Sequence, residues 1–231
     1  MSDRRLAFIR ELEQADEAVA AVLTELDELY AACEAVRGRA LELEAFFVRL
    51  PDERAAASLA AKGARAAVDE SRAAAERAAE ELRAAEMGRD DERIAAARRF
   101  DIRARDALRT AERRLHDAEE HAGRLEAQAD AAVDEARELT HRGRQLADAL
   151  AERPRLAAEA GAPPEEGLAG IAEWGTGARA ALLVARSQLA AERDAVVRQA
   201  NELGALVLGE PLTATSAAGV ARRVERELGT R

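Results

Sequence analysis

Apolar residues recur at alternating steps of three and four from Ile94 to Leu150, and this repeat constrains the fold more than any other feature. Only Asp101 and Gly143 interrupt it. A 3.5-residue repeat sustained over this length is typical of a left-handed coiled coil. It predicts one helix over about 91–152, on the order of 90 Å long. The repeat, called the seam here, comprises Ile94, Ala97, Ala104, Leu108, Ala111, Leu115, Ala118, Ala122, Leu125, Ala129, Ala132, Ala136, Leu139, Leu146 and Leu150.

The same spacing predicts three further long helices. Two lie before the seam helix, over about 3–50 and 52–87, and one begins near Ala178. The first apolar series is unbroken, the second is weaker in large side chains, and the last has polar gaps. Their members are Leu12, Ala15, Val19, Val22, Leu26, Leu29, Cys33, Val36, Ala40, Leu43, Phe47 and Leu50; Ala57, Ala61, Ala64, Val68, Ser71, Ala75, Ala78, Leu82 and Ala85; and Ala178, Leu182, Ala185, Leu189, Val196, Leu203 and Leu206.

Helix-stop and helix-start residues divide the chain. Pro51 cannot continue a helix but suits the first turn of the next, so a break is expected there. Gly88 is expected as a C-terminal cap and Asp90 as the following N-cap. The segment 153–177, which contains RPRLAAEAGAPPEEG and WGTG, predicts a loop and irregular linker.

The expected fold is all-α: an elongated antiparallel coiled-coil bundle of four main helices plus a short C-terminal helix. Residues 1–152 would form a three-helix antiparallel coiled coil, and residues 153–177 a linker. Residues 178–231 would supply the fourth helix and the short one, which Ser216 would cap and Gly229 would end. Since the third helix outruns the second, its distal half is expected to pair with the fourth.

Charge supports a hairpin that turns near Gly88. Residues 69–92 carry nine acids and four arginines, a net of −5, whereas residues 93–114 carry eight arginines and three acids, a net of +5. A hairpin lays these segments side by side. Each exposed pair is worth at most about 1 kcal/mol, so the pattern indicates orientation rather than stability.

Composition agrees with slender helices. Charged residues make up 35% of the chain and aromatic residues 3%, which excludes a thick core, while 48% apolar content with a regular repeat argues against disorder. Alanine at many seam positions lets helix axes approach closely and favours the helix. The leucines, such as Leu125 and Leu139, are then expected to supply most of the apolar burial.

The sequence also indicates the kind of partner and compartment. The net charge of −10 disfavours non-specific nucleic-acid binding. Lys62 is the only lysine, so nearly all basic residues are arginine, which we interpret as a high-GC coding bias and a bacterial source. Cys33 is the only cysteine, and neither a signal peptide nor an apolar run of about 20 residues is apparent. We therefore expect a soluble, cytoplasmic protein.

No residue pattern predicts catalysis or metal binding. His116 and His121 lie five residues apart and share no helix face. Glu138 and His141 have the Glu-x-x-His spacing of di-iron bundles, but they point away from the seam and have no second copy. Cys33 occupies a core position without a histidine nearby in sequence. Phosphate-binding glycine loops and dinucleotide fingerprints are absent from the sequence, so we expect no catalytic, cofactor-binding or metal site, no cofactor and no small-molecule substrate.

Two segments carry open alternatives. The arginine-rich residues 93–114 could meet anionic lipid or nucleic acid, or be neutralised by acidic neighbours, and the absence of interleaved aromatic residues favours the second reading. Residues 203–212 (LGALVLGEPL) are locally apolar. They are expected to pack back on the bundle end, with an apolar docking site as the alternative.

The stretch AAEELRAAEMGRDDERIAAARR, residues 78–99, resembles a family hairpin tip that reads small–Arg–acidic. The family is the phage-shock, ESCRT-III-like group of membrane-remodelling proteins. The resemblance implies a polymer that binds anionic membranes in a salt-sensitive manner. Two features depart from the family: Pro51, where a long continuous helix would be expected, and an N-terminus with balanced charges.

The function expected from these features is a non-enzymatic coiled-coil scaffold or adaptor that mediates protein–protein contacts or self-association. The membrane-remodelling polymer is the alternative, with membrane binding less favoured. A chromosome-associated accessory protein is the third reading, although nucleic acid is an unfavoured partner.

Overall fold

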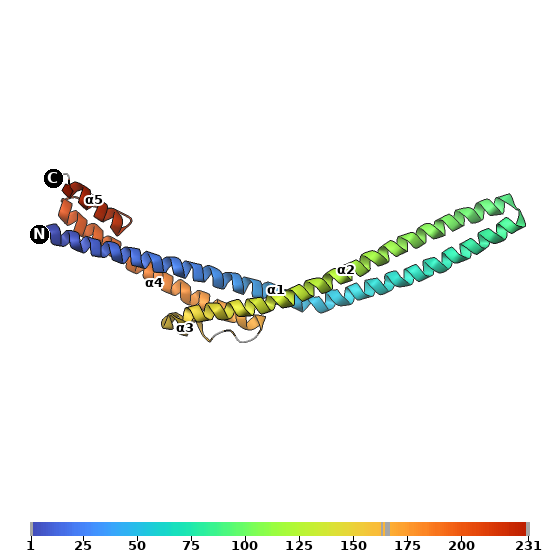
Figure 1. Ribbon diagram of the computed structural model, residues 1–231, viewed down its shortest axis with the longest axis horizontal. Helices are drawn as coiled ribbons and strands as arrows, with labels where there is room; N and C mark the ends of the chain where they lie inside the picture. Colours follow the sequence, from blue (N-terminus) through green and yellow to red (C-terminus); the bar gives the residue numbers. More distant parts are fainter. Residues whose placement is uncertain (1, 163, 165–166, 230–231) are drawn as a thin grey trace. The chain divides into compact units, whose positions relative to one another are not determined.

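The computed structural model describes residues 2–162, 164 and 167–229 and shows an all-α chain, as expected, with no strand among those residues (Figure 1). The two longest helices are α1 and α2, and the short α3 precedes α4. The bounds are α1 Ser2–Gly88, α2 Asp91–Ala151, α3 Pro154–Ala160, α4 Leu168–Leu208 and α5 Ala217–Gly229.

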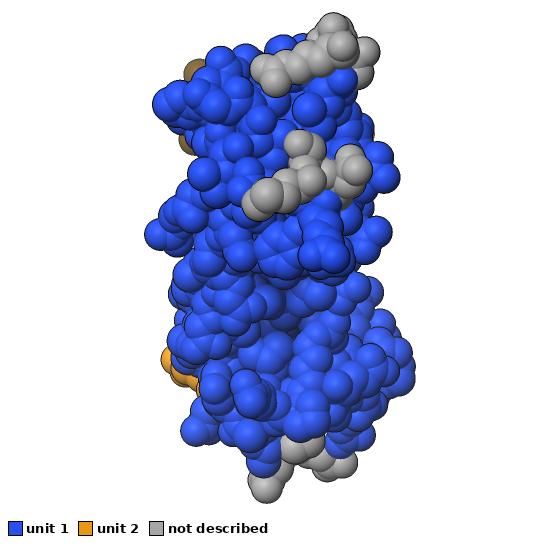
Figure 2. All heavy atoms as spheres, turned by 90° about the vertical axis from the view of Figure 1, so that its left-hand side faces the viewer, with its two compact units in different colours: residues 1–42, 136–231 blue, residues 43–135 orange. Residues whose placement is uncertain are grey.

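The chain divides into two compact units. Unit 1 comprises residues 1–42 and 136–231, and unit 2 comprises residues 43–135 (Figure 2, blue and orange). Helices α1 and α2 each contribute to both units. These boundaries differ from the expected division at 152 and 177, because the start of α1 packs with the C-terminal helices rather than only with its sequence neighbours.

Unit 2 is an antiparallel hairpin of α1 and α2. Every seam position from Ile94 to Ala132 is buried or half-buried, and Asp101, which interrupts the apolar repeat, is buried as well. Across the hairpin, Leu50 and Ala57 pack with Leu125 and Ala129. Ion pairs flank the seam: Arg98 with Glu86, Arg65 with Glu119, and Arg54 with Glu126.

The expected turn lies between the two arms, with one difference. Asp90 is the N-cap of α2, since its Oδ1 accepts hydrogen bonds from the backbone N–H groups of Glu92 (3.1 Å) and Arg93 (3.2 Å). Gly88 ends α1, but the left-handed residue is Arg89, with φ +54°. Arginine therefore takes the conformation that glycine would adopt more readily.

The break expected at Pro51 is wrong, because α1 continues through it. The separate helices 3–50 and 52–87 are one helix. Proline removes one backbone donor and hinders the preceding turn, which costs roughly 3 kcal/mol in a helix interior. Pro51 is exposed, and Leu50 and Ala57 on either side are buried in the same cluster with Leu125. This packing holds both sides of the proline in one helix.

Unit 1 contains two apolar clusters. In the first, Leu26 and Cys33 of α1 meet Leu150 of α2 and Leu182 of α4, so the end of α2 pairs with α4 as expected. In the second, the start of α1 packs against the end of α4 and against α5 (Figure 1). The second cluster contains Ile9, Leu12, Ala200, Ala217, Val220, Ala221 and Val224.

The expected irregular linker at 153–177 is also wrong in large part. Residues 154–160 form α3, and α4 begins at Leu168, ten residues before the predicted start near Ala178. The WGTG sequence lies within α4, and its two glycines face neighbouring chain segments. A Cβ on Gly175 would lie 2.9 Å from Arg37 Cβ, and one on Gly177 would lie 2.6 Å from the carbonyl oxygen of Ala160. Trp174 is buried beside them in the first cluster.

Candidate functional site

One carboxylate on α1 fixes the position of α4 and α5. Asp16 is 3% exposed; its Oδ1 accepts a hydrogen bond from Arg193 Nε at 2.7 Å, and its Oδ2 accepts one from the backbone N–H of Ala217 at 2.9 Å. Because Ala217 begins α5, the negative charge lies at the positive end of that helix. Ser216 caps the same helix as expected, accepting a hydrogen bond from the Gly219 N–H.

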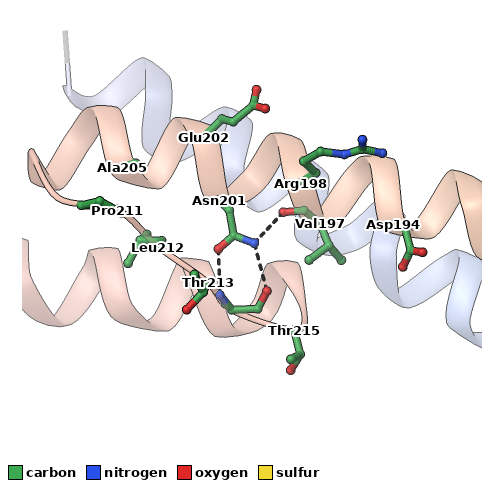
Figure 3. A pocket seen from close by; sticks show the side chains of 11 residues that line it. Asp194, Val197, Arg198, Asn201, Glu202, Ala205, Pro211, Leu212, Thr213 and Thr215 are labelled. Carbon is green, nitrogen blue, oxygen red and sulfur yellow. Dashed lines mark hydrogen bonds between the residues drawn. The ribbon is translucent and has the colours of Figure 1, made fainter.

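A groove of about 650 Å³ lies between α4 and the segment that leads to α5 (Figure 3). Asn201 crosses it. Its Nδ2 donates to the carbonyl oxygens of Val197 and Ala214, and its Oδ1 accepts from the Ala214 N–H. The amide therefore holds the connecting segment against α4. The remaining polar lining groups include Asp194, Arg198 and Glu202, which lie at the rim of the groove (Figure 3).

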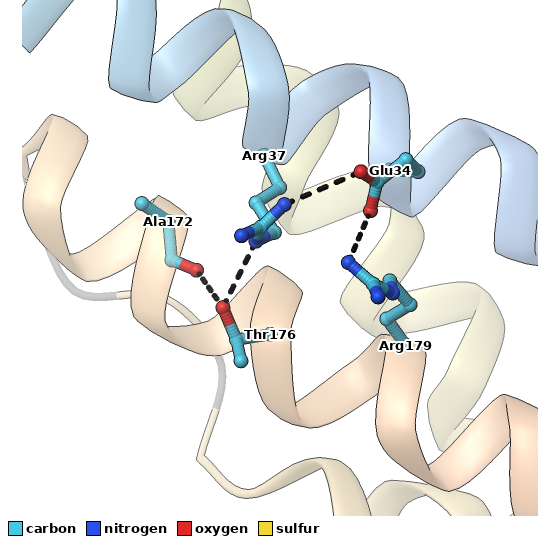
Figure 4. A network of polar contacts seen from close by, with 5 residues as sticks. All are labelled: Glu34, Arg37, Ala172, Thr176 and Arg179. Atoms are coloured by element: carbon cyan, nitrogen blue, oxygen red, sulfur yellow. Dashed lines mark hydrogen bonds and ion pairs between the residues drawn. The ribbon is translucent and has the colours of Figure 1, made fainter.

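A second polar network joins α1 to α4 (Figure 4). Glu34 accepts from Arg37 (3.2 Å) and from Arg179 (3.0 Å), while Arg37 Nε donates to Thr176 Oγ1 at 3.1 Å. The Thr176 hydroxyl in turn donates to the carbonyl oxygen of Ala172. Each group is matched to a partner, so the arrangement orients the two helices and offers no activated nucleophile.

The histidines are not brought into a metal site. His116 and His121 are exposed; His141 is exposed and contacts Gln145, while Glu138 pairs with Arg142. Within the described residues, no three His, Cys, Asp or Glu side chains are grouped so that they could hold a metal ion.

Cys33 is a core residue, as predicted. It is fully buried between Leu26, Leu150 and Leu182, and burial raises the pKa of its thiol to about 11. Since the thiolate is the nucleophilic form, the thiol is poorly reactive near neutral pH.

The 93–114 segment is partly neutralised, and the 203–212 segment packs back. Arg98 pairs with Glu86 on the other arm, and Arg105 pairs with the buried Asp101. Leu203, Val207, Leu208 and Leu212 pack against the second cluster of unit 1, whereas Leu206, expected in the helix-facing series, is 64% exposed.

The hairpin carries most of the strongly exposed large apolar side chains. Met87 is 81% exposed, Val48 73%, Leu59 72% and Ile102 59%. Near the turn, Phe100 lines an open groove of about 500 Å³ together with four alanines, Glu81 and Arg93. The open surfaces of this hairpin, rather than an enclosed cavity, are the candidate binding sites.

Sequence reasoning missed the polar residues that position helices and the exposed face of α1. Arg179, Arg186 and Arg193 recur every seven residues on α4 and pair with acids of α1. Of the three, only Arg193 falls in a polar gap of the fourth apolar series, between Leu189 and Val196. A second signal lies between Ala45 and Ala73 of α1, where small and apolar residues recur out of phase with the residues that pack against α2.

No helix in the described part of the chain combines the length and the apolar content that a membrane span requires. Comparison with known proteins found no family model, no curated protein and no solved structure that matches this chain.

Proposed function

We propose that this protein is a non-enzymatic coiled-coil scaffold or adaptor that acts through contacts with protein partners or with other copies of itself. One observation carries the proposal: unit 2 consists of two helices only. Each arm spans roughly 70 Å at 1.5 Å per residue, and the core between them is a single seam. Such an arm has a large accessible surface for its length and suits recognition over an extended face.

The contacts in unit 1 support the same function. Asp16, Asn201 and the Glu34 network all join one chain segment to another. These polar groups hold helix ends and helix faces in register, which a scaffold needs. Binding surfaces built on rigid helices present their residues with little loss of conformational entropy.

Photo-crosslinking in cells would test the proposal. A photoreactive phenylalanine analogue would replace exposed residues of the hairpin, Leu59 and Phe100, and the half-buried Leu146 of unit 1 as the matched control. Specific crosslinked species at the hairpin positions, to a protein or to another copy, are expected. If no hairpin position gave a specific crosslink while the variants remained folded, the adaptor function would be rejected.

A membrane-remodelling polymer is the second candidate, and the unbroken α1 helix favours it. The break expected at Pro51 was one departure from the phage-shock, ESCRT-III-like family, and α1 instead continues to a turn at Gly88. This candidate predicts filaments in negative-stain images and sedimentation with anionic liposomes that weakens as salt rises. A constant low mass and no liposome binding at low salt would eliminate it.

A further inference from the structure

The side of α1 that faces away from α2 carries a second apolar repeat. From Ala45 to Ala73, small and apolar residues recur at steps of three and four, and the repeat is interrupted by Asp52 and Glu70. Every one of these residues is exposed. We call this surface the outer face; its members are Ala45, Val48, Asp52, Ala55, Leu59, Gly63, Ala66, Glu70 and Ala73.

The outer face lies opposite the seam. Leu59 is midway between Ala57, which is buried, and Ala61, which is half-buried, so it points to the other side of the helix. Val48 and Leu59 are 73% and 72% exposed, and a Cβ added at Gly63 would meet nothing within 4 Å. The alanines and the glycine of this face leave room for another helix to approach closely, and Val48 and Leu59 supply apolar area to bury.

Four charged residues on or beside the outer face make no ion pair within the described residues: Arg49, Asp52, Lys62 and Glu70. They differ from Arg54 and Arg65, which flank the seam and pair across the hairpin with acids of α2. The unpaired charges have alternating signs along the helix. Their order indicates what can cover the face.

We infer that the outer face binds the same face of a second copy, with the two α1 helices antiparallel and Leu59 at the two-fold axis. Ala45 then lies opposite Ala73 of the other copy, and Ala55 opposite Gly63. A self-complementary patch of this kind closes into a discrete dimer. The inference rests on the proposed scaffold function and names one of its partners.

Charge selects this register. With Leu59 at the axis, Arg49 lies beside Glu70 of the second copy, and Asp52 lies within reach of the long side chain of Lys62. Each pair occurs twice because of the symmetry. If the axis moved toward Ala56, Arg49 would lie opposite Lys62 of the second copy. In a parallel pair, each charged residue would lie beside the identical residue of the second copy. Both alternatives bring like charges together, which disfavours them.

Mass measurement over a hundredfold concentration range tests the inference. The wild-type chain of 24.8 kDa is expected to double in mass as concentration rises. Leu59→Asp should hold the chain at the monomer mass. Ile102→Asp changes an exposed apolar residue of α2 outside the outer face, and this variant should still double in mass. Both replaced side chains are exposed, so circular dichroism should show unchanged helicity.

Charge reversal tests the register. Arg49→Glu and Glu70→Arg should each raise the dissociation constant at least tenfold, and the double variant should restore dimer formation. Leu59→Cys should give a disulfide-linked dimer under mild oxidation, whereas Met87→Cys should not, and the buried Cys33 provides little background.

A monomer at every concentration, a Leu59→Asp variant that still dimerises, a double variant without rescue, or open-ended growth in mass would each overturn the inference. Such a result leaves the adaptor function separately testable, because crosslinks from Leu59 to a different protein would support that function in a chain that stays monomeric.

Discussion

At the scale of single residues, Asp16 is the side chain that joins α1 to both α4 and α5. Replacing it with alanine leaves the Arg193 guanidinium and the Ala217 N–H without their acceptor. Arg193 is 37% exposed and can be partly hydrated, so the expected loss is about 2 kcal/mol rather than the larger cost of a fully buried pair. Urea unfolding, monitored by circular dichroism, measures this loss in the free energy of unfolding.

Asp27→Ala is the control for that change. Asp27 pairs with Arg186 between the same two helices, but both side chains are 52% exposed, so the loss should stay below about 1 kcal/mol. Equal losses for the two variants would show that burial of Asp16 contributes nothing.

Cys33 gives a residue-scale prediction on pH. Burial raises the pKa of its thiol from 9.0 to about 11, so the folded protein keeps the proton over a range where the unfolded chain loses it. The unfolded state then binds fewer protons, and this contribution to stability, complete below pH 9, declines as pH rises toward about 11.

The measurable consequence is slow thiol chemistry. At pH 8 the folded protein should react with an aromatic disulfide reagent far more slowly than the chain in urea, at a rate that follows unfolding. Rapid, complete reaction of the folded protein would mean that Cys33 is accessible, contrary to its burial.

At the scale of helices, the apolar repeat was the most predictable feature. The phase of the repeat predicts where a helix ends better than helix-stop residues such as proline do. Leu50 and Ala57 lie one heptad apart, so the apolar phase continues across Pro51, whereas it slips between Ala85 and Ile94 at the true turn. Continuity of phase therefore outweighs a single proline. Pairing of α1 with α4 and α5 was not predictable in this way, because it depends on residues as distant as Asp16 and Ala217.

Pro51→Ala tests the continuous helix. If α1 runs through residue 51, alanine supplies the N–H that proline lacks and should stabilise the protein by about 2 kcal/mol, after allowance for the greater freedom of the unfolded chain. Pro154→Ala is the matched control. Pro154 begins α3, where proline is tolerated, and little gain is expected. A lower melting temperature for Pro51→Ala would contradict the continuous helix.

Gly177 tests the contact between α3 and α4. Alanine is the better helix former by about 1 kcal/mol, but its Cβ would lie 2.6 Å from the carbonyl oxygen of Ala160. Because that atom belongs to the backbone, α3 must move, and a net loss of about 2 kcal/mol is expected on urea unfolding. Gly123→Ala, in open space on α2, should instead stabilise the protein. A stabilised Gly177→Ala variant would show that α3 does not pack there.

At the scale of the whole molecule, unit 2 is one continuous stretch of sequence, residues 43–135, that separates the two segments of unit 1 along the chain. Its packing repeats by the heptad, whereas unit 1 is held by contacts specific to particular residues. Trp174, the only tryptophan, is buried in unit 1 and reports on that unit alone. The two units can therefore be tested separately in one protein.

Shortening both arms by whole heptads should leave unit 1 intact. Deleting residues 71–84 together with 100–113 removes two heptads from each arm, keeps the seam in phase and preserves the turn at Gly88. We expect high helicity by circular dichroism and an unchanged unfolding transition by Trp174 fluorescence.

The control removes ten residues from each arm instead, residues 71–80 and 104–113. At about 100° per residue this rotates the distal seam by roughly 80° away from its partner. The hairpin of unit 2 should then lose much of its helicity on mild heating, while the unfolding transition of unit 1, followed by Trp174 fluorescence, stays at the same temperature. If the two deletions behaved alike, packing along the arm would not depend on the heptad phase. If the heptad deletion shifted the Trp174 transition, the stability of unit 1 would depend on the length of the arm, and the two units would fold as one.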